Sequence, residues 1–232
     1  MFVMFCEAGD TAAQHCARAM RPKLAAPLRV VTPEELSYSA EIVHEVTSEN
    51  VSGSIAMLSG DPLTYETTFG AVNRLQDVPK AHLQAFVEHD RDYVLQEMRA
   101  ILSSWIFGLP CRVTNRPTAG SLSGPYHVPA VQQVLAAQAG LPVADGDTAP
   151  ATGRALAATV IGSHVICDPE LAVFEDALAL YGTLSGLDVL ELVFDATETG
   201  PVFRQAHAFA DLARGADQSA AALAAMLGGY QA

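Results

Sequence analysis

Lysine is almost missing from this chain of 232 residues, which contains only Lys23 and Lys80. Arginine does not compensate, because Lys and Arg together number 13 against 26 Asp and Glu, a formal net charge of −13. Phosphate contacts to nucleic acids need clustered Lys and Arg, and an anionic membrane surface repels an acidic protein. The composition therefore predicts no nucleic-acid partner and no membrane partner.

Cysteine is also sparse, and Cys6, Cys16, Cys111 and Cys167 form no C-x-x-C pair. Isolated cysteines in apolar or strand-like surroundings are typical of buried, reduced thiols. No apolar run approaches the roughly 18–20 residues that a membrane span needs. The first residues, MFVMFC, lack the basic segment of a signal peptide. We therefore expect a cytoplasmic protein.

Half of the residues are hydrophobic and 17% are charged, so a substantial core can form and a disordered chain is excluded. In the first half, the order strand, helix, strand, short helix predicts a parallel αβ layer. The elements expected there are a strand at MFVMFC, a helix to about Arg21, a strand at 28–32, a short helix from Pro33, a half-exposed strand EIVHEV, a long helix at about 80–104 and a strand at 111–115.

The second half alternates paired strands with helices, which predicts a compact α+β unit. The elements expected there are a helix at 128–139 closed by Gly140, a hairpin at 155–167, a helix from Pro169 to about Leu184, a hairpin at 188–208 and a helix at 217–227. We place the boundary near Asn115, which gives domains 1–115 and 116–232. The predicted fold class is α/β followed by α+β.

Several segments, taken in order, resemble one family. SIAMLSGDPLTYETTFGAVNRL, HDRDYVLQEMRAILSSWIFGL and PCRVTNRP resemble the N-terminal (pre-ATP-grasp) domain of ATP-grasp proteins, in particular the group of peptide-ligase maturases and glutathione-synthetase-like enzymes. VPAVQQVLAAQAGLPV, GRALAATVIGSHVIC and GLDVLELVFDATETGPVFRQAHAF are similar to later elements of the same family. The resemblance implies a pre-ATP-grasp-like domain followed by a shortened ATP-grasp unit.

Three departures from the family pattern point away from catalysis. The family builds a nucleotide-clamping lid of roughly 60 or more residues, where this chain has the eleven residues from Val143 to Gly153. The family's lysine before the "Gl.vP" element would fall at 127–129, which reads His-Val-Pro. The Glu and Asn that close the family's Mg²⁺ site correspond to Gln205 and His207. A nucleotide held with Mg²⁺ needs anionic oxygens and fixed cations.

Acidic residues of the last hairpin are the candidates for a remnant of the metal site. Glu191 and Asp195 lie four apart on one expected strand and share a face, and the resemblance adds Gln205 and His207. The alternative is a solvated acidic pair. His207 and Asp211 have the i, i+4 spacing of a general-base pair, which is also common on protein surfaces.

A set of arginines is the candidate for an anion or ligand site. The resemblance brings Arg74, Arg112, Asn115, Arg116 and Arg154 near the cleft between the domains, and arginine suits carboxylate or phosphate recognition. The alternative is that they pair with the abundant Asp and Glu. The loop PTAGSLSGPYH is either a phosphate cradle or a connector, and it contains no phosphate-binding fingerprint.

The leading hypothesis is a degenerate, lidless ATP-grasp-like protein that binds a small ligand or a partner and needs no cofactor. The partner is expected to be a second copy in a homodimer, or an intact ATP-grasp enzyme. The alternative is an ATP- and Mg-dependent carboxylate–amine (peptide) ligase with a minimal or partner-completed site. A third reading, an unrelated α/β domain, is favoured if the strand pair at 155–167 does not pack beside the hairpin at 188–208.

Overall fold

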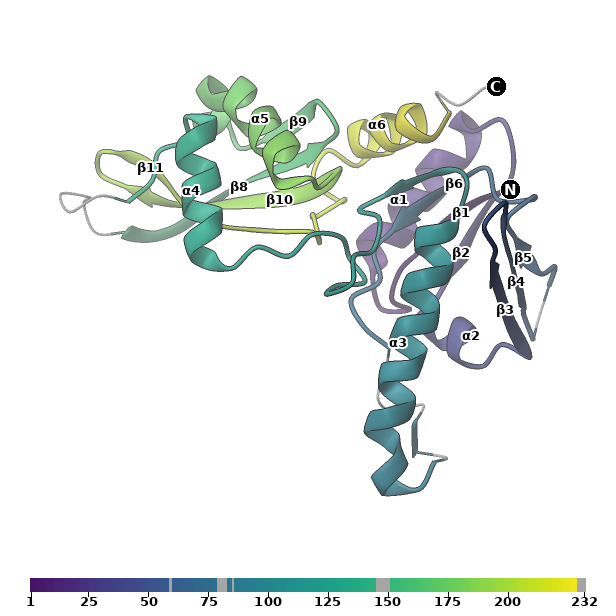
Figure 1. Ribbon diagram of the computed structural model, residues 1–232. Helices are drawn as coiled ribbons and strands as arrows, with labels where there is room; N and C mark the ends of the chain where they lie inside the picture. Colours follow the sequence, from purple (N-terminus) through teal and green to yellow (C-terminus); the bar gives the residue numbers. More distant parts are fainter. Residues whose placement is uncertain (59, 79–82, 85, 145–150, 229–232) are drawn as a thin grey trace.

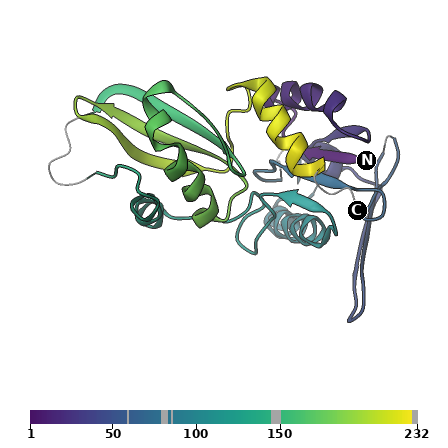
Figure 2. The same cartoon turned by 90° about the horizontal axis from the view of Figure 1, so that it is seen from above.

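The computed structural model describes residues 1–58, 60–78, 83–84, 86–144 and 151–228. The chain forms two lobes, one around a parallel sheet and one around an antiparallel sheet (Figure 1). The last helix, α6 (Ala216–Gly228), follows the second sheet but lies beside α1 (Thr11–Met20) of the first lobe (Figure 2). The chain therefore crosses between the lobes twice. No helix within the described ranges is long and apolar enough to span a membrane.

The first lobe is built on a parallel sheet with the strand order β2-β1-β6-β7. Its strands are β1 (Phe2–Phe5), β2 (Leu28–Val31), β6 (Gly70–Asn73) and β7 (Arg112–Thr114). Alternate residues of β1 face opposite cores: Phe2 and Met4 pack toward α1 and α6, whereas Val3 and Phe5 pack toward α3 (Arg91–Gly108). Burial on both faces explains why β1 is continuously apolar. The predicted parallel αβ layer is confirmed.

A three-stranded antiparallel sheet of β3 (Glu41–Val46), β4 (Val51–Ala56) and β5 (Leu63–Thr64) adjoins the first lobe. It follows α2 (Pro33–Ser37), whose N-terminus carries a capping box between Thr32 and Glu35. The short helix from Pro33 and the half-exposed strand EIVHEV are therefore confirmed.

The predicted helix at 80–104 is wrong at both ends. Residues 79–82 and 85 lie outside the described residues, and the α-helix α3 begins at Arg91 after a 3₁₀ turn, η3 (Glu88–Asp90). The Nε of Arg91 donates to the Phe86 carbonyl (3.1 Å), which closes a turn before the helix. The charged run EHDRD therefore lies at the start of the helix, and α3 continues to Gly108.

The second lobe is an antiparallel sheet with the strand order β11-β10-β8-β9. Its strands are β8 (Ala151–Ile161), β9 (His164–Cys167), β10 (Val189–Thr197) and β11 (Gly200–His207). One face packs against α4 (Pro129–Ala139) and α5 (Glu175–Ser185), and a 3₁₀ turn, η4 (Pro169–Phe174), precedes α5. Both predicted hairpins are present, and β8 pairs directly with β10. The condition that favoured an unrelated domain is therefore not met.

Cysteines follow the sequence expectation within the described residues, where no disulfide is found. Cys6 and Cys16 are buried, and Cys111 and Cys167 are half-buried. Burial raises the pKa of the Cys6 and Cys16 thiols to about 11, so both are protonated at neutral pH.

Asn115 joins the two lobes. It follows β7 in a left-handed conformation with φ = 47°, and it is 1% exposed. Its side-chain Oδ1 accepts from the backbone N–H groups of Asp188 (2.9 Å) and Val189 (3.0 Å), while its Nδ2 donates to the Val189 carbonyl (2.6 Å). The side chain thus satisfies the backbone where β10 begins, which fixes the second sheet against the end of β7.

Arg74 makes the second junction between the lobes. Its Nε and Nη2 donate to Asp10 Oδ2 (3.0 and 2.8 Å), and its Nη1 donates to the carbonyl of Ala210 (3.0 Å). Asp10 is also the N-cap of α1, through a bond from the Ala13 N–H (2.9 Å). Because Arg74 is only 5% exposed, this ion pair ties the end of β6 to α1 and to the segment that follows β11.

Two substitutions of Asn115 separate its side-chain bonds from its backbone strain. Asn115→Ala removes the bonds to Asp188 and Val189 and keeps a side chain at positive φ, so we expect the free energy of unfolding to fall by about 3 kcal/mol. Asn115→Gly loses the same bonds without the strain and should cost about 1 kcal/mol less. Urea denaturation measures both, and losses below about 0.5 kcal/mol in both variants would show that the junction is held elsewhere.

Candidate functional site

The expected remnant of a metal site lies on the face of the second sheet opposite α4 and α5. The register pairs Glu191 with His207 and Val193 with Gln205, so these residues share one face. Asp195, four residues after Glu191 on β10, lies on the same face. The structure therefore brings Glu191, Asp195, Gln205 and His207 to one surface.

Both carboxylates on this face already have partners. Glu191 Oε2 accepts from the Asp211 N–H (2.7 Å), and Asp195 Oδ1 forms an ion pair with Arg204 Nη1 (3.0 Å). The carboxylate of Asp211 accepts from the Ala213 N–H (3.0 Å) within its own turn. Across the part of the chain that the structure describes, no three His, Cys, Asp or Glu side chains converge closely enough to hold a metal ion.

The candidate arginines are divided among separate contacts. Arg112 forms an ion pair with Asp188, whose other oxygen accepts from the Asn115 N–H (3.3 Å), so these two candidates share one carboxylate. Arg154 pairs with Glu170 (2.7 Å) on the surface of the second lobe. Arg74 is occupied at the junction described above.

Arg116 closes the end of α3. Its guanidinium donates to the carbonyls of Phe107, Leu109 (3.1 Å) and Cys111 (2.7 Å), and it lies over the Phe107 ring at 5.9 Å from the centroid. Carbonyls at a helix C-terminus lack intrahelical donors, and a cation there also complements the helix dipole. These bonds give Arg116 a role in holding the end of α3.

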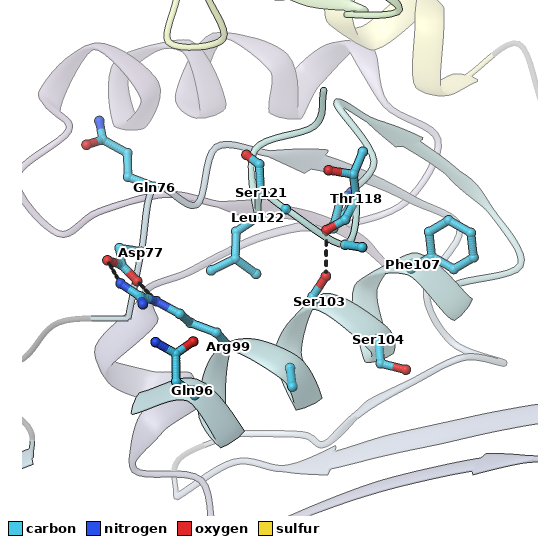
Figure 3. Close-up of a pocket in the computed structure, with 14 residues that line it drawn as sticks. Gln76, Asp77, Gln96, Arg99, Ser103, Ser104, Phe107, Thr118, Ser121 and Leu122 are labelled. Carbon is cyan, nitrogen blue, oxygen red and sulfur yellow. Dashed lines mark hydrogen bonds and ion pairs between the residues drawn. The ribbon is translucent and has the colours of Figure 1, made fainter. Parts of the chain in front are cut away.

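A cavity of about 790 Å³ lies between α3 and the loop that follows β7 (Figure 3). It is at the carboxyl ends of β6 and β7, the edge where open parallel sheets bind ligands. Its lining residues come from the segment after β6, from one face of α3 and from the loop: Gln76, Asp77, Gln96, Arg99, Ala100, Ser103, Ser104, Phe107, Pro117, Thr118, Ala119, Gly120, Ser121 and Leu122. This cavity is the candidate ligand site.

An ion pair forms one end of the cavity. Arg99 Nε donates to Asp77 Oδ1 (2.6 Å), and Arg99 Nη2 donates to Asp77 Oδ2, so the pair is bidentate (Figure 3). Asp77 Oδ1 also accepts from the Val78 N–H (2.7 Å). The hydrogen bond to Asp77 raises the pKa of Arg99, which stays charged. Both side chains are partly exposed, at 33% for Arg99 and 45% for Asp77.

The loop 117–122 forms the opposite wall. Thr118 and Ser121 exchange backbone hydrogen bonds (2.9 and 3.3 Å), which makes a tight turn. Ser103 Oγ of α3 donates to the Thr118 carbonyl (3.4 Å), and the buried Asn73 Nδ2 donates to the Leu122 carbonyl (2.7 Å). The first part of PTAGSLSGPYH is therefore a held wall of the cavity.

The sequence pointed to the loop that begins at Pro117, but the lining residues of α3 and of the segment after β6 were not among the predicted candidates. One signal was present: Gln96, Arg99, Ser103 and Phe107 have the three- and four-residue spacing of a single helix face. A second was their place beside loops that leave a parallel sheet at its carboxyl edge.

The fold is similar to that of known ATP-grasp proteins. No protein-family model matches the chain, and no curated protein matches it. Among solved structures, the macrocyclase MdnB of Microcystis aeruginosa MRC has a TM-score of 0.71 at 13% identity, over 97% of this chain and 98% of that chain. A RiPP-associated ATP-grasp ligase of Chryseobacterium gregarium, solved with ADP and a leader and core peptide, has a TM-score of 0.74 at 7% identity, over 97% and 96%.

The chain has an ATP-grasp-like fold, as the sequence resemblance implied. The ATP-grasp ligase PsnB, complexed with a phosphomimetic variant of a minimal precursor, Mg and ADP, has a TM-score of 0.68 at 15% identity, over 97% of each chain. The Chryseobacterium gregarium protein and PsnB are ATP-grasp ligases, and their similarity to this chain is one of fold. The mixed α/β class predicted from the sequence is confirmed.

An acidic neighbourhood lies beside this edge of the sheet. Burial raises the pKa of Glu7, and the charges of Glu34, Asp77 and Asp10 raise it further. A carboxyl group whose pKa is higher in the folded than in the unfolded protein destabilises the fold once it is ionised. The penalty is absent below the unfolded pKa, and it develops as the pH rises through the folded one.

Glu7→Gln removes this penalty without changing the size of the side chain. We expect a higher urea midpoint than wild type at pH 7 and the same midpoint at acidic pH, where Glu7 is protonated in both states. Chemical denaturation across a pH series measures the difference. Glu49→Gln, at an exposed turn, is the matched control and should show no such rise. A Glu7→Gln gain that persists unchanged at acidic pH would contradict the electrostatic explanation.

Proposed function

We propose that this protein is a degenerate, non-catalytic member of the ATP-grasp-like fold that binds a small ligand or a partner. The observation that carries the proposal is the ion pair between Asp195 and Arg204. It puts a guanidinium beside a carboxylate on the face where the resemblance would place Mg²⁺. A cation held there by its own counter-ion opposes the binding of a divalent ion.

The neighbouring donors do not fit Mg²⁺ either. Mg²⁺ is held by hard oxygen ligands, usually one or two carboxylates, in near-ideal octahedral geometry. Gln205 is neutral, and the carboxylate of Glu191 accepts a backbone N–H (2.7 Å). We therefore derive no reaction step through a metal or a nucleotide on this sheet.

The path of the chain also leaves little room for a lid. The Phe203 N–H donates to the Pro142 carbonyl (2.6 Å), and Val143 bridges to Phe203, so the segment after α4 lies at the edge of the second sheet. Only the eleven residues from Val143 to Gly153 then precede Arg154. A subdomain that closes over a nucleotide needs roughly 60 residues.

One observation favours the alternative of an ATP- and Mg-dependent peptide ligase. Two of the similar structures, each matching over 97% of this chain, are ATP-grasp ligases with ADP bound. Such an activity would need a second chain to supply the missing ligands and cations. An intact ATP-grasp enzyme is the partner that this alternative requires.

Nucleotide titration distinguishes the two functions. For the wild-type chain, we expect calorimetry with ATP and Mg²⁺ to show no binding heat, and coupled assays with peptide pools to show no ADP above a blank. Removing the guanidinium and restoring a carboxylate in Arg204→Ala/Gln205→Glu should allow Mn²⁺ to bind, as measured by electron paramagnetic resonance. Arg154→Ala, which breaks an exposed ion pair elsewhere, is the control and should bind no Mn²⁺. ADP formation by the wild-type chain alone would contradict the proposal.

The partner that we propose is a second copy, docked through the outer face of α4 and α5. This face, the α4–α5 face, exposes the apolar side chains of Val128, Val131, Val134, Leu180 and Leu184. The two helices lie side by side, and α4 contains no charged residue. In a chain of net charge −13, two copies can approach here without opposing rows of carboxylates. Exposed apolar patches of this kind mark interaction surfaces.

A charge on the α4–α5 face should separate the copies. Val134 is 56% exposed, and we expect Val134→Glu to convert a dimer to a monomer because it buries a carboxylate against a like-charged partner. Val173→Glu is the matched control, since Val173 is 83% exposed on η4, and it should remain dimeric. Sedimentation velocity at low and high salt measures the state. A monomeric wild type, or a monomeric Val173→Glu, would contradict this interface.

A further inference from the structure

We propose that the cavity between α3 and the loop 117–122 binds a small monocarboxylate, whose carboxylate is received by the outer edge of the Arg99 guanidinium. This inference deepens the proposed ligand-binding function and rests on it. The starting observation is the geometry of one side chain. Arg99 lines the cavity, and Asp77 holds it through a bidentate ion pair (Figure 3).

The ion pair uses only part of the donor capacity of Arg99. A guanidinium has five N–H donors in a planar fork. Asp77 takes the N–H of Nε and one N–H of Nη2, which leaves the two N–H groups of Nη1 and the second of Nη2. Within the described ranges, no protein group accepts from them. The Nη1–Nη2 edge matches the two oxygens of a carboxylate.

Asp77 also fixes the orientation of that edge. An arginine on a flexible stem loses side-chain entropy when it binds a ligand. Here the side chain of Arg99 is already ordered in the unliganded protein, because both oxygens of Asp77 hold one side of the guanidinium. Binding a ligand would therefore cost less side-chain entropy. The Val78 N–H holds Asp77 in turn (2.7 Å). Asp77 is thus a positioning residue, and Arg99 is the group that would touch the ligand.

The arginines predicted from the sequence do not offer the same edge to this cavity. Arg74 donates through Nε, Nη1 and Nη2 to Asp10 and Ala210. Arg116 donates from both Nη1 and Nη2 to the carbonyls at the end of α3. Neither of them lines the cavity, whereas Arg99 does.

The remaining walls indicate the chemistry of the rest of the ligand. Gln76 and Gln96 bring amides, which both donate and accept, and Ser103, Ser104 and Ser121 bring hydroxyls. None of these groups is charged. They suit a body with neutral hydrogen-bonding groups, and about 790 Å³ lies within the range of small-molecule sites.

Charge limits the ligand to one negative group. Asp77 offsets the charge of Arg99, and the same carboxylate interacts with Glu7 strongly enough to help raise its pKa. A polyanion such as a phosphate ester would meet this acidic surrounding, where Arg99 is the one cation among the described residues that line the cavity and is already paired. A monocarboxylate has one charge and the planar shape of the free edge, so it is the class that fits.

Matched acids and amides test the proposal on the full chain. The probes are N-acetylglycine, N-acetylserine and N-acetylglutamine, each beside its carboxamide, with inorganic phosphate as a separate arm. Binding is followed by ¹H–¹⁵N spectra, in which the Arg99 Nε–H and the amides of Ala119 and Gly120 report on the cavity. We expect at least one acid to shift these signals saturably, and its carboxamide to bind at least tenfold more weakly.

Variants separate positioning from general charge. Arg99→Lys keeps the charge but not the fork, and should weaken acid binding at least tenfold. Asp77→Asn removes a negative charge and weakens the bonds that position Arg99, so we also expect weaker acid binding. If Asp77 acted only through its charge, removing that charge would strengthen the binding of an acid. Arg18→Gln, which removes a positive charge from the exposed side of α1, is the control and should bind as wild type does. Circular dichroism checks that each variant is folded.

Each outcome of these titrations decides for or against the site. Shifts by no acid, equal shifts by acid and carboxamide, preferential binding of phosphate, or an equal loss in Arg18→Gln would each overturn the proposal. ADP formation by the wild-type chain bears on the proposed function instead, and it leaves carboxylate binding at Arg99 standing if the acids still bind. Loss of acid binding in Arg99→Lys with no ADP formation supports both.

Discussion

The arrangement of this molecule depends on one buried side chain, Asn115. It adopts the left-handed backbone (φ = 47°) at the end of the parallel sheet and satisfies the backbone of Val189 with both ends of its amide. The backbone carbonyl of Asn115 accepts from Asn73 Nδ2 (2.9 Å), which also donates to the Leu122 carbonyl (2.7 Å). One network therefore joins the two lobes and also holds the loop that forms one wall of the cavity. Buried amides of this kind are costly to leave unpaired, so the network acts as a unit.

Scarcity of cations explains how the arginines are used. A chain with 13 cationic and 26 acidic residues has few positive side chains for each task, and a lysine cannot make a planar, multidentate contact. Arg74 binds a carboxylate and a carbonyl across the lobes, and Arg116 binds three carbonyls at the end of α3. These guanidiniums connect separate segments of the backbone. Arg99 differs because its ion pair leaves one edge of the fork facing no protein group in the described part of the chain.

Local patterns in the sequence predicted most of the fold, and long-range contacts decided what it could not predict. The apolar strand MFVMFC, the short helix from Pro33 and the two hairpins of the second half could all be predicted, because each depends on neighbours in the chain. The start of α3 was not, since Phe86 and Val87 look like helix positions but are exposed. The environment of Arg99 depends on Asp77, 22 residues away in the sequence, and on the loop 117–122 that follows β7. Periodicity showed that Gln96, Arg99 and Ser103 share a face, but not what lies opposite.

The cavity lies apart from the face of the second sheet where the resemblance would place Mg²⁺. The proposed ligand could therefore bind in the cavity without a nucleotide on that sheet. Every wall of the cavity comes from the segment after β6, from α3 or from the loop 117–122, and none comes from the sheet that carries Glu191, Asp195 and Arg204. A shortened connection between α4 and β8 therefore removes nothing from the cavity. One link between the two regions is the Asn115 network, which holds the loop and the start of β10 together. A ligand bound at Arg99 would therefore lie in a cavity that no residue of the second sheet lines.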